Sequence, residues 1–134
     1  MKKRNKILVM LLAFALPFAC IGCSEVEGST SIGYEQISGA KAKALMESES
    51  GYIIIDARTQ SEYDEGHIPG AILIPEYEIA SRAENELPDK NQLILVYCRS
   101  GRRSKIAAEE LVKLGYTNVK EFGGIIDWEY EIEK

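Results

Sequence analysis

After residue 23 this 134-residue chain contains a single cysteine, Cys98, and a single histidine, His67. One cysteine cannot form an internal disulfide, which excludes a disulfide framework in the folded part. Basic residues are scarce as well: beyond residue 23 there are 12 Lys and Arg against 21 Asp and Glu, a net charge of −9. Such a surface repels nucleic acid, so we expect no nucleic-acid partner, and any anion-binding site must be built locally.

The long apolar run of the chain lies at the N-terminus. Residues 7–21 are apolar, broken only by Pro17, and they follow a cluster of basic side chains, Lys2, Lys3, Arg4 and Lys6. A membrane span needs about 20 apolar residues, so this run is short for one and has the layout of an export signal.

The run ends in "ACIGC", residues 19–23, which resembles the lipobox of bacterial lipoproteins. In that family the cysteine after the small residues is lipidated and becomes the new N-terminus. Cys23 fits this position, although Cys20 stands where the pattern usually has Leu. Cys20 is the alternative lipidation site, and an uncleaved anchor is the alternative to a lipoprotein. We therefore expect residues 1–23 to be a lipoprotein-type signal, and the protein to be exported and lipid-anchored to a bacterial membrane outside the cytoplasm.

The rest of the chain predicts a flexible tether over residues 24–33 and one domain over residues 34–134. Several short runs in the domain are apolar throughout, which is typical of strands buried on both faces of a parallel sheet. The expected strands are residues 52–55, 71–74, 93–97 and 118–122, with a further one near 34–37.

Helical patterns alternate with these strands. We expect a helix capped by Ser38, a polar helix over residues 76–87, a helix capped by Ser104 and a short helix that contains Trp128. Alternating strands and helices predict an open α/β sheet, in which functional sites lie at the carboxyl ends of the strands. Cys98 falls at such an end.

The stretch "VYCRSGRRS", residues 96–104, places this cysteine among basic side chains. A tight loop there directs backbone N–H groups and a helix N-terminus at the thiol, which lowers its pKa. Gly101 permits the close turn. The forked donors of Arg99, Arg102 and Arg103 suit an oxyanion. The pattern predicts a cysteine nucleophile that acts on a small anion; the alternative is a buried cysteine beside a solvated surface loop.

Four motifs in register, "DAR" at 56–58, "EYDEGHIPGA" at 62–71, "VYCRSGRRS" at 96–104 and "GGIIDW" at 123–128, resemble the rhodanese family. The resemblance implies an α/β fold with a central, mostly parallel sheet of about five strands flanked by helices. It also implies a sulfurtransferase in which Cys98 carries sulfur as a persulfide. The substrate-binding loop is then Arg99, Ser100, Gly101, Arg102, Arg103 and Ser104.

In the implied cycle the Cys98 thiolate attacks thiosulfate or a similar sulfur-containing anion, and the sulfur then passes to cyanide, a thiol or a protein acceptor. This chemistry calls for no cofactor and no metal, and we expect a monomer. Asp56 and Arg58 are expected to support the loop, as a buried ion pair or by orienting it. His67 is expected to be structural, with a Cys–His dyad as the alternative.

Two other functions stay open. Phosphatases and arsenate reductases of related fold use C-x5-R, whereas Cys98 to Arg103 is C-x4-R; the shorter cradle suits a single sulfur better than a tetrahedral phosphate. A tethered module that binds a partner or carries persulfide sulfur without turnover is the other alternative.

Overall fold

The computed structural model describes residues 33–134. These residues form a five-stranded sheet in which every neighbouring pair is parallel, in the order β1-β5-β4-β2-β3. The strands are β1 (Glu35–Gln36), β2 (Ile53–Asp56), β3 (Ile72–Leu73), β4 (Ile94–Cys98) and β5 (Val119–Gly124). The predicted α/β fold with a parallel sheet flanked by helices is confirmed.

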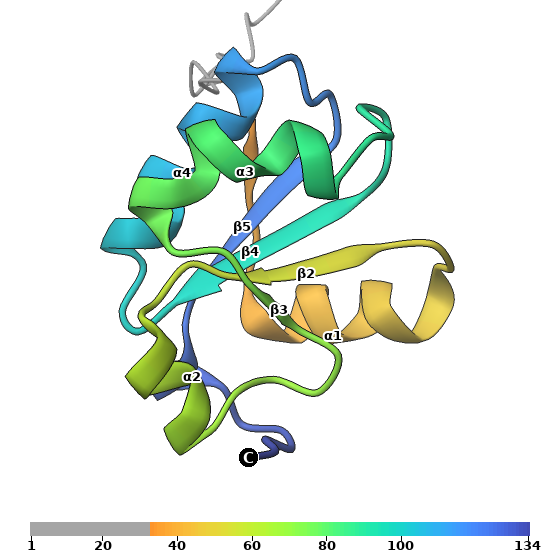
Figure 1. The fold of residues 1–134 in the computed structure, drawn as a ribbon. Coiled ribbons are helices and arrows are strands. Elements are labelled where there is room, and N and C mark those ends of the chain that lie inside the picture. Colours follow the sequence, from red (N-terminus) through yellow and green to blue (C-terminus); the bar gives the residue numbers. More distant parts are fainter. Residues whose placement is uncertain (1–32) are drawn as a thin grey trace, which may run out of the picture.

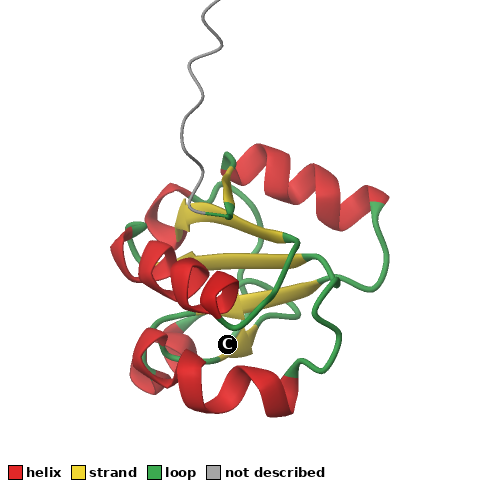
Figure 2. Ribbon diagram, turned by 90° about the horizontal axis from the view of Figure 1, so that it is seen from above, coloured by secondary structure: helices red, strands yellow, loops and turns green. Residues whose placement is uncertain are grey.

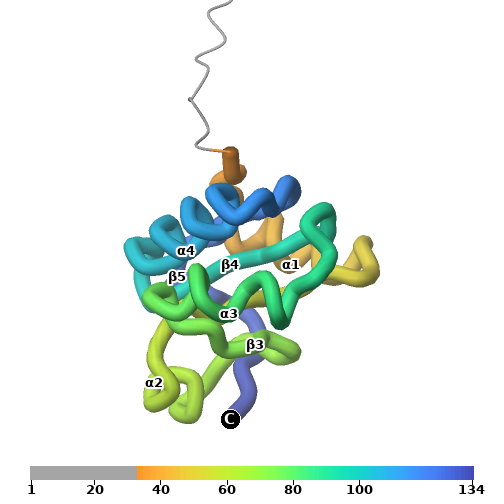
Figure 3. Tube along the Cα trace, turned by 45° about the horizontal axis from the view of Figure 1, so that its top comes forward, coloured from red at the N-terminus to blue at the C-terminus, as the bar shows by residue number. Residues whose placement is uncertain are grey.

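Helices cover both faces of this sheet, as Figures 1 and 2 show. On one face α3 and α4 pack against the strands, and on the other face lies α1. The short helix α2 lies beyond the strand ends, on the same side as the C-terminus (Figure 3). The helical elements are α1 (Gly39–Ser48), α2 (Gln60–Glu65), η1 (Glu76–Glu78), α3 (Ile79–Glu86), α4 (Arg102–Lys113) and η2 (Ile125–Asp127).

Strand β4 lies in the centre of the sheet, and all five of its residues are buried. Side chains alternate between the two faces of a strand. Ile94, Val96 and Cys98 therefore belong to the core beneath α3 and α4, whereas Leu95 and Tyr97 belong to the core on the α1 face. Cys98 and Tyr97, although adjacent in the sequence, therefore make their contacts on opposite faces of the sheet.

The element boundaries follow local chemistry in most places. The Ser38 side chain accepts a hydrogen bond from the Lys41 amide and caps α1, as predicted. The expected cap at Ser104 is wrong, because α4 begins at Arg102 and Ser104 lies inside it. Gly101, at a φ of 105°, turns the chain sharply enough for the helix to start earlier. Helix α2 had no counterpart among the predicted elements.

The expected signal, the lipidation site at Cys23 and nearly all of the expected tether lie outside the described residues. Within residues 33–134, no helix is both long enough and apolar enough to traverse a bilayer.

Candidate active site

Cys98 is the last residue of β4, and three residues separate it from α4. The thiol therefore lies at the N-terminal end of a 12-residue helix, where the helix dipole is positive. The side chain is 1 % exposed. This position is at the carboxyl end of a central parallel strand, where open α/β sheets place their sites.

Hydrogen bonds surround the Cys98 sulfur. The Gly101 amide donates to Sγ over 3.0 Å, and the Ser104 Oγ lies 3.3 Å from Sγ. Burial on its own would raise the pKa of the Cys98 thiol. Hydrogen bonds from the Ser104 hydroxyl and from the amides of Ser104, Gly101 and Ser100 outweigh burial, so the pKa lies below its ordinary value. The site thus favours a thiolate, the nucleophilic form of cysteine.

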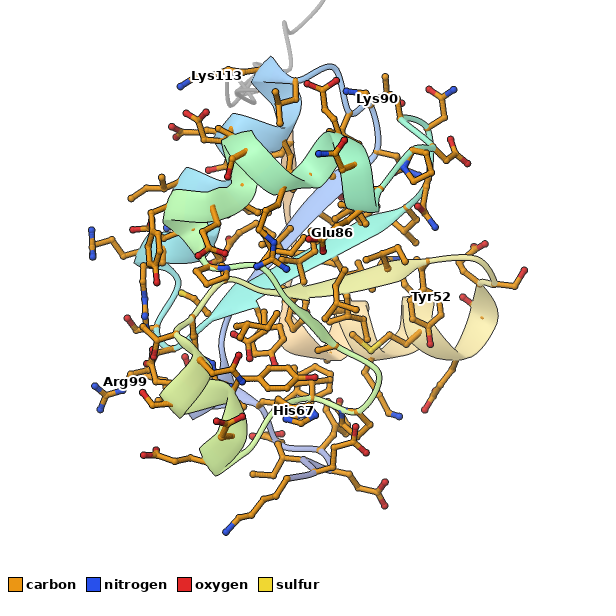
Figure 4. All side chains as sticks on the ribbon, viewed as in Figure 1. Tyr52, His67, Glu86, Lys90, Arg99 and Lys113 are labelled. Atoms are coloured by element: carbon orange, nitrogen blue, oxygen red, sulfur yellow. The ribbon has the colours of Figure 1, made fainter. Side chains whose placement is uncertain are left out.

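The three arginines of the loop have different environments. Arg99 and Arg102 are exposed, and the Arg99 side chain extends away from the ribbon in Figure 4. Arg103 is half-buried, and its guanidinium donates to both carboxylate oxygens of Glu62 over 2.7 and 2.8 Å. Two of the Arg103 nitrogens are therefore engaged inside the protein, whereas Arg99 and Arg102 keep their donors available.

Glu62 is held in place by the start of α2. Its side chain accepts a hydrogen bond from the Thr59 amide over 3.0 Å, and the Thr59 side chain in turn accepts from the Glu62 amide, which forms a capping box. The Arg103 hydrogen bond, followed by the bonds from Thr59, lowers the pKa of Glu62 to about 2 although burial opposes the shift. Glu62 is thus a firmly ionised partner that fixes the first turn of α4 to α2.

Ser104 lies on the other side of the loop and is fully buried. Its hydroxyl is 2.6 Å from Oε1 of Glu121, a residue of β5 that is itself only 2 % exposed. Oε1 of Glu121 also accepts the Gly123 amide over 2.8 Å. Cys98, Ser104 and Glu121 therefore form a continuous buried chain of polar groups beneath the loop.

The Gly123–Gly124 pair packs directly against the backbone of the loop that follows Cys98. A β carbon on Gly124 would lie 1.9 Å from the carbonyl oxygen of Arg99 and 2.6 Å from the Cα of Ser100. Only glycine fits at such a separation from backbone atoms. Ile126 adds a hydrogen bond from its amide to the Arg99 carbonyl over 3.3 Å.

Asp56 and Arg58 form a buried ion pair on the opposite face of the sheet from Cys98. Arg58 donates to Asp56 over 2.7 and 2.9 Å, and also to the Gly66 carbonyl. Tyr97 donates its hydroxyl proton to Asp56 Oδ2 over 2.7 Å and accepts the Ile68 amide. Their connection to Cys98 therefore passes through Tyr97, the residue before it.

His67 contacts other groups than Cys98. Its ring stacks on Tyr63 with centroids 3.7 Å apart, and Nδ1 lies 2.9 Å from the Tyr63 carbonyl. Its Nε2 lies 3.3 Å from a carboxylate oxygen of Glu133, and its backbone pairs with that residue. Figure 4 shows His67 among aromatic rings below the sheet. Through its contacts with Glu133, His67 helps to hold the C-terminal segment against the segment that follows α2.

Sequence reasoning missed two acidic residues of this site, Glu62 and Glu121. The pattern Thr59-x-x-Glu62 is a capping-box signal and was available in the sequence. Glu121 carried no comparable signal, because one acidic residue in a short strand is ordinarily a solvated side chain.

The family profile named "Rhodanese-like domain" matches residues 38–131, which include the whole loop and both acidic residues. The chain belongs to the rhodanese-like family. The predicted resemblance is therefore confirmed. Within residues 33–134, no group of three or more His, Cys, Asp or Glu side chains is arranged to hold a metal ion.

This rhodanese-like protein is similar to several proteins that are named as sulfurtransferases. It is 44% identical over 73 residues to "Thiosulfate sulfurtransferase PspE" of Escherichia coli K12, covering 54% of this chain and 70% of that one. It is 33% identical over 96 residues to "Thiosulfate sulfurtransferase GlpE" of Coxiella burnetii, covering 71% and 87%. A solved structure, "rhodanese with anions from E. coli", superposes with a TM-score of 0.59 at 40% identity, covering 62% of this chain and 98% of that one. These relatives support a rhodanese-type sulfurtransferase function.

Proposed function

We propose that this protein moves sulfane sulfur from thiosulfate, or a similar small anion, to a thiophilic acceptor through a persulfide on Cys98. The observation that carries the proposal is the buried Cys98 sulfur at a helix N-terminus, bonded to the Gly101 amide over 3.0 Å, with a lowered thiol pKa. A thiolate in such a cradle needs no general base, because it is already ionised.

The first half of the cycle loads the enzyme. The Cys98 thiolate attacks the outer sulfur of thiosulfate and forms a new S–S bond. The original S–S bond of thiosulfate breaks, and sulfite leaves with its electron pair. The exposed guanidinium groups of Arg99 and Arg102 supply positive charge at the rim, which attracts an anion to an otherwise acidic protein.

The second half unloads it. The acceptor, cyanide or a thiolate, attacks the outer sulfur of the persulfide, and the electron pair of that S–S bond returns to Cys98. The loop amides and Ser104 then stabilise the regenerated thiolate. The persulfide form of the enzyme is the product of the first half-reaction and the reactant of the second. The kinetics should therefore be ping-pong.

The loop length supports sulfur over phosphate as the transferred group. Three residues link β4 to α4, and two nitrogens of Arg103 are engaged by Glu62. The arginine of the C-x4-R segment is therefore less available to bind a tetrahedral oxyanion. A phosphatase or arsenate-reductase activity is the alternative, and hydrolysis of an aryl phosphate by the same protein tests for the phosphatase.

The test is to incubate the full-length protein with thiosulfate, alkylate it, digest it with trypsin and weigh the peptide of residues 91–99, which carries Cys98. We expect a gain of one sulfur atom that cyanide removes with release of thiocyanate, and no gain in Cys98→Ser. Hydrolysis of an aryl phosphate without sulfur uptake would instead assign a phosphatase. Neither activity would leave a binding module.

We also propose that the protein is exported and held outside the cytoplasm by a lipid on Cys23, with Cys20 as the alternative position. The basic, apolar and small-residue segments of residues 1–23 support this. Cell fractionation with metabolic fatty-acid labelling tests it: Cys23→Ala should lose the label and leave the membrane, whereas Cys20→Ala should keep both. The opposite result would move the anchor to Cys20, and no label in the wild type would refute it.

A further inference from the structure

Glu121 is a buried carboxyl group whose role the sulfur-transfer cycle above does not use. Its side chain is 2 % exposed, on the face of the sheet covered by α4. Among residues 33–134 it takes part in no ion pair. A buried carboxylate without a cation is costly, so such a group either gains strong hydrogen bonds or holds a proton.

Its two donors are the Gly123 amide at 2.8 Å and the Ser104 hydroxyl at 2.6 Å. The Ser104 hydroxyl has one proton but several acceptors around it. Besides Glu121, the Gly101 carbonyl lies at 3.0 Å, the Cys98 sulfur at 3.3 Å and the Gly123 carbonyl at 3.4 Å from Ser104 Oγ. Ser104 can therefore donate to Glu121 or to Cys98, but not to both at once.

The two ionisation states of Cys98 need opposite orientations of this hydroxyl. A Cys98 thiol donates to Ser104 Oγ, and Ser104 then donates to an ionised Glu121. A Cys98 thiolate requires the Ser104 proton for itself, which leaves Glu121 short of a donor. If Glu121 carries a proton, it donates to Ser104 Oγ, and the chain of hydrogen bonds is complete in the reverse direction.

We propose that Glu121 and Cys98 share one proton across Ser104, which makes Glu121 a positioning residue for the nucleophile. The S–H bond of Cys98 breaks, Ser104 Oγ receives that proton and passes its own to Glu121, and an O–H bond forms on the carboxyl group. Ser104 keeps one hydrogen throughout, and the three groups together keep a charge of −1. The proposal rests on the Cys98 thiolate chemistry proposed above.

The other charged groups near the hydrogen-bonded series Cys98–Ser104–Glu121 are paired or exposed. From α4, Arg103 binds Glu62 of α2. On the sheet, Lys120 pairs with Glu35 of β1, and the β1 residue in register with Glu121 is Gln36. Arg99, Arg102 and Asp127 are exposed to solvent. Cys98 is thus the titrating group to which Glu121 is connected by hydrogen bonds.

The first test compares the pH dependence of Cys98 alkylation by iodoacetamide in the full-length wild type and in Glu121→Gln, followed on the peptide of residues 91–99. Glutamine keeps the shape of the side chain, but it carries no charge and cannot hold the shared proton. We expect the alkylation midpoint to fall by about one pH unit or more. A midpoint that stays in place or rises would overturn the proposal. Glu129→Gln, an exposed carboxylate, is the matched control and should change nothing.

The second test follows the same coupling from the carboxyl group of the unaltered Glu121. The ¹³C resonance of the Glu121 carboxyl is followed with pH in the wild type and in Cys98→Ser. We expect Glu121 to stay protonated to higher pH in the wild type, because Cys98 and Glu121 titrate as one unit. The same titration curve in both proteins would overturn the proposal.

Neither measurement depends on sulfur transfer. Coupled titration in a protein that takes up no sulfur would refute the proposed function and leave the shared proton standing. Sulfur loading without coupling would do the reverse.

Discussion

The guanidinium of Arg103 binds both carboxylate oxygens of Glu62, over 2.7 and 2.8 Å, and so joins the first turn of α4 to the start of α2. Arg103 follows Cys98 in the "VYCRSGRRS" motif, and Glu62 belongs to the "EYDEGHIPGA" motif. Two of the motifs that are far apart in the sequence thus form one support around the Cys98 loop.

Replacing Glu62 by Gln should change the acid stability of the protein. The pKa of Glu62 is lowered from 4.5 to about 2, chiefly by the Arg103 hydrogen bond. A lowered carboxyl pKa stabilises the fold above pH 4.5, and this contribution disappears as the pH falls toward 2. The melting temperatures of wild type and Glu62→Gln should therefore differ most above pH 4.5 and converge near pH 2.

The control for this measurement is Glu65→Gln, an exposed glutamate of the same helix. It should melt with the wild type at every pH. A constant difference between wild type and Glu62→Gln down to pH 2 would show that the ion pair is not the cause.

Replacing Gly124 by Ala should displace the active loop. A β carbon at this position would lie 1.9 Å from the Arg99 carbonyl oxygen, so the backbone of Arg99 and Ser100 must move. Misplacing a catalytic loop by about 1 Å costs on the order of 100-fold in rate. The initial rate of sulfur loading from thiosulfate measures this loss.

Gly39→Ala is the matched control. A β carbon on Gly39 would make an ordinary contact of 3.5 Å with the Trp128 ring. This variant should load sulfur at the wild-type rate. Equal rates for both variants would mean that the loop tolerates the displacement.

Replacing Ser104 by Ala should raise the pKa of Cys98. The Ser104 hydroxyl is the first of the hydrogen bonds that oppose burial and lower the thiol pKa. A hydrogen bond to a charged group is worth enough to move the midpoint upward by about one pH unit. Alkylation of Cys98 by iodoacetamide should then slow near neutral pH and recover at high pH. Ser81→Ala, an exposed serine of α3, is the control, and an unchanged midpoint in Ser104→Ala would contradict the assigned role.

Replacing Tyr97 by Phe should destabilise the protein without touching the sulfur of Cys98 directly. The hydroxyl of Tyr97 donates to the buried Asp56 carboxylate and accepts from the Ile68 amide; without it Asp56 keeps Arg58, but the Ile68 amide loses its partner. A buried polar group left unpaired costs about 1–3 kcal/mol. Urea unfolding should show a free energy of unfolding reduced by this amount. Tyr77→Phe, at a side chain that is 70 % exposed, should unfold as the wild type does, and equal stability of the two variants would refute the role of the network.

Sequence reasoning predicted the strands well because their signal is local. Each apolar run, such as residues 93–97, is long enough to be buried on both faces, and β4 (Ile94–Cys98) coincides with it within one residue. It also predicted the position of Cys98 at a strand end, because the apolar run stops at the cysteine. Helix α2 was missed because its six residues are polar and carry no apolar period; only its capping box marked it.

The sequence by itself therefore determined the family, the parallel α/β architecture and the place of Cys98 at a strand end, since these depend on apolar runs, turn residues and motifs read along the chain. Only the tertiary structure decided which groups surround the sulfur. The strand order and register bring Glu121 to Ser104 and Gly124 to the Arg99 carbonyl, and α2 brings Glu62 to Arg103. These partners lie far apart in the chain, and the packing of one element against another is what sets their separations.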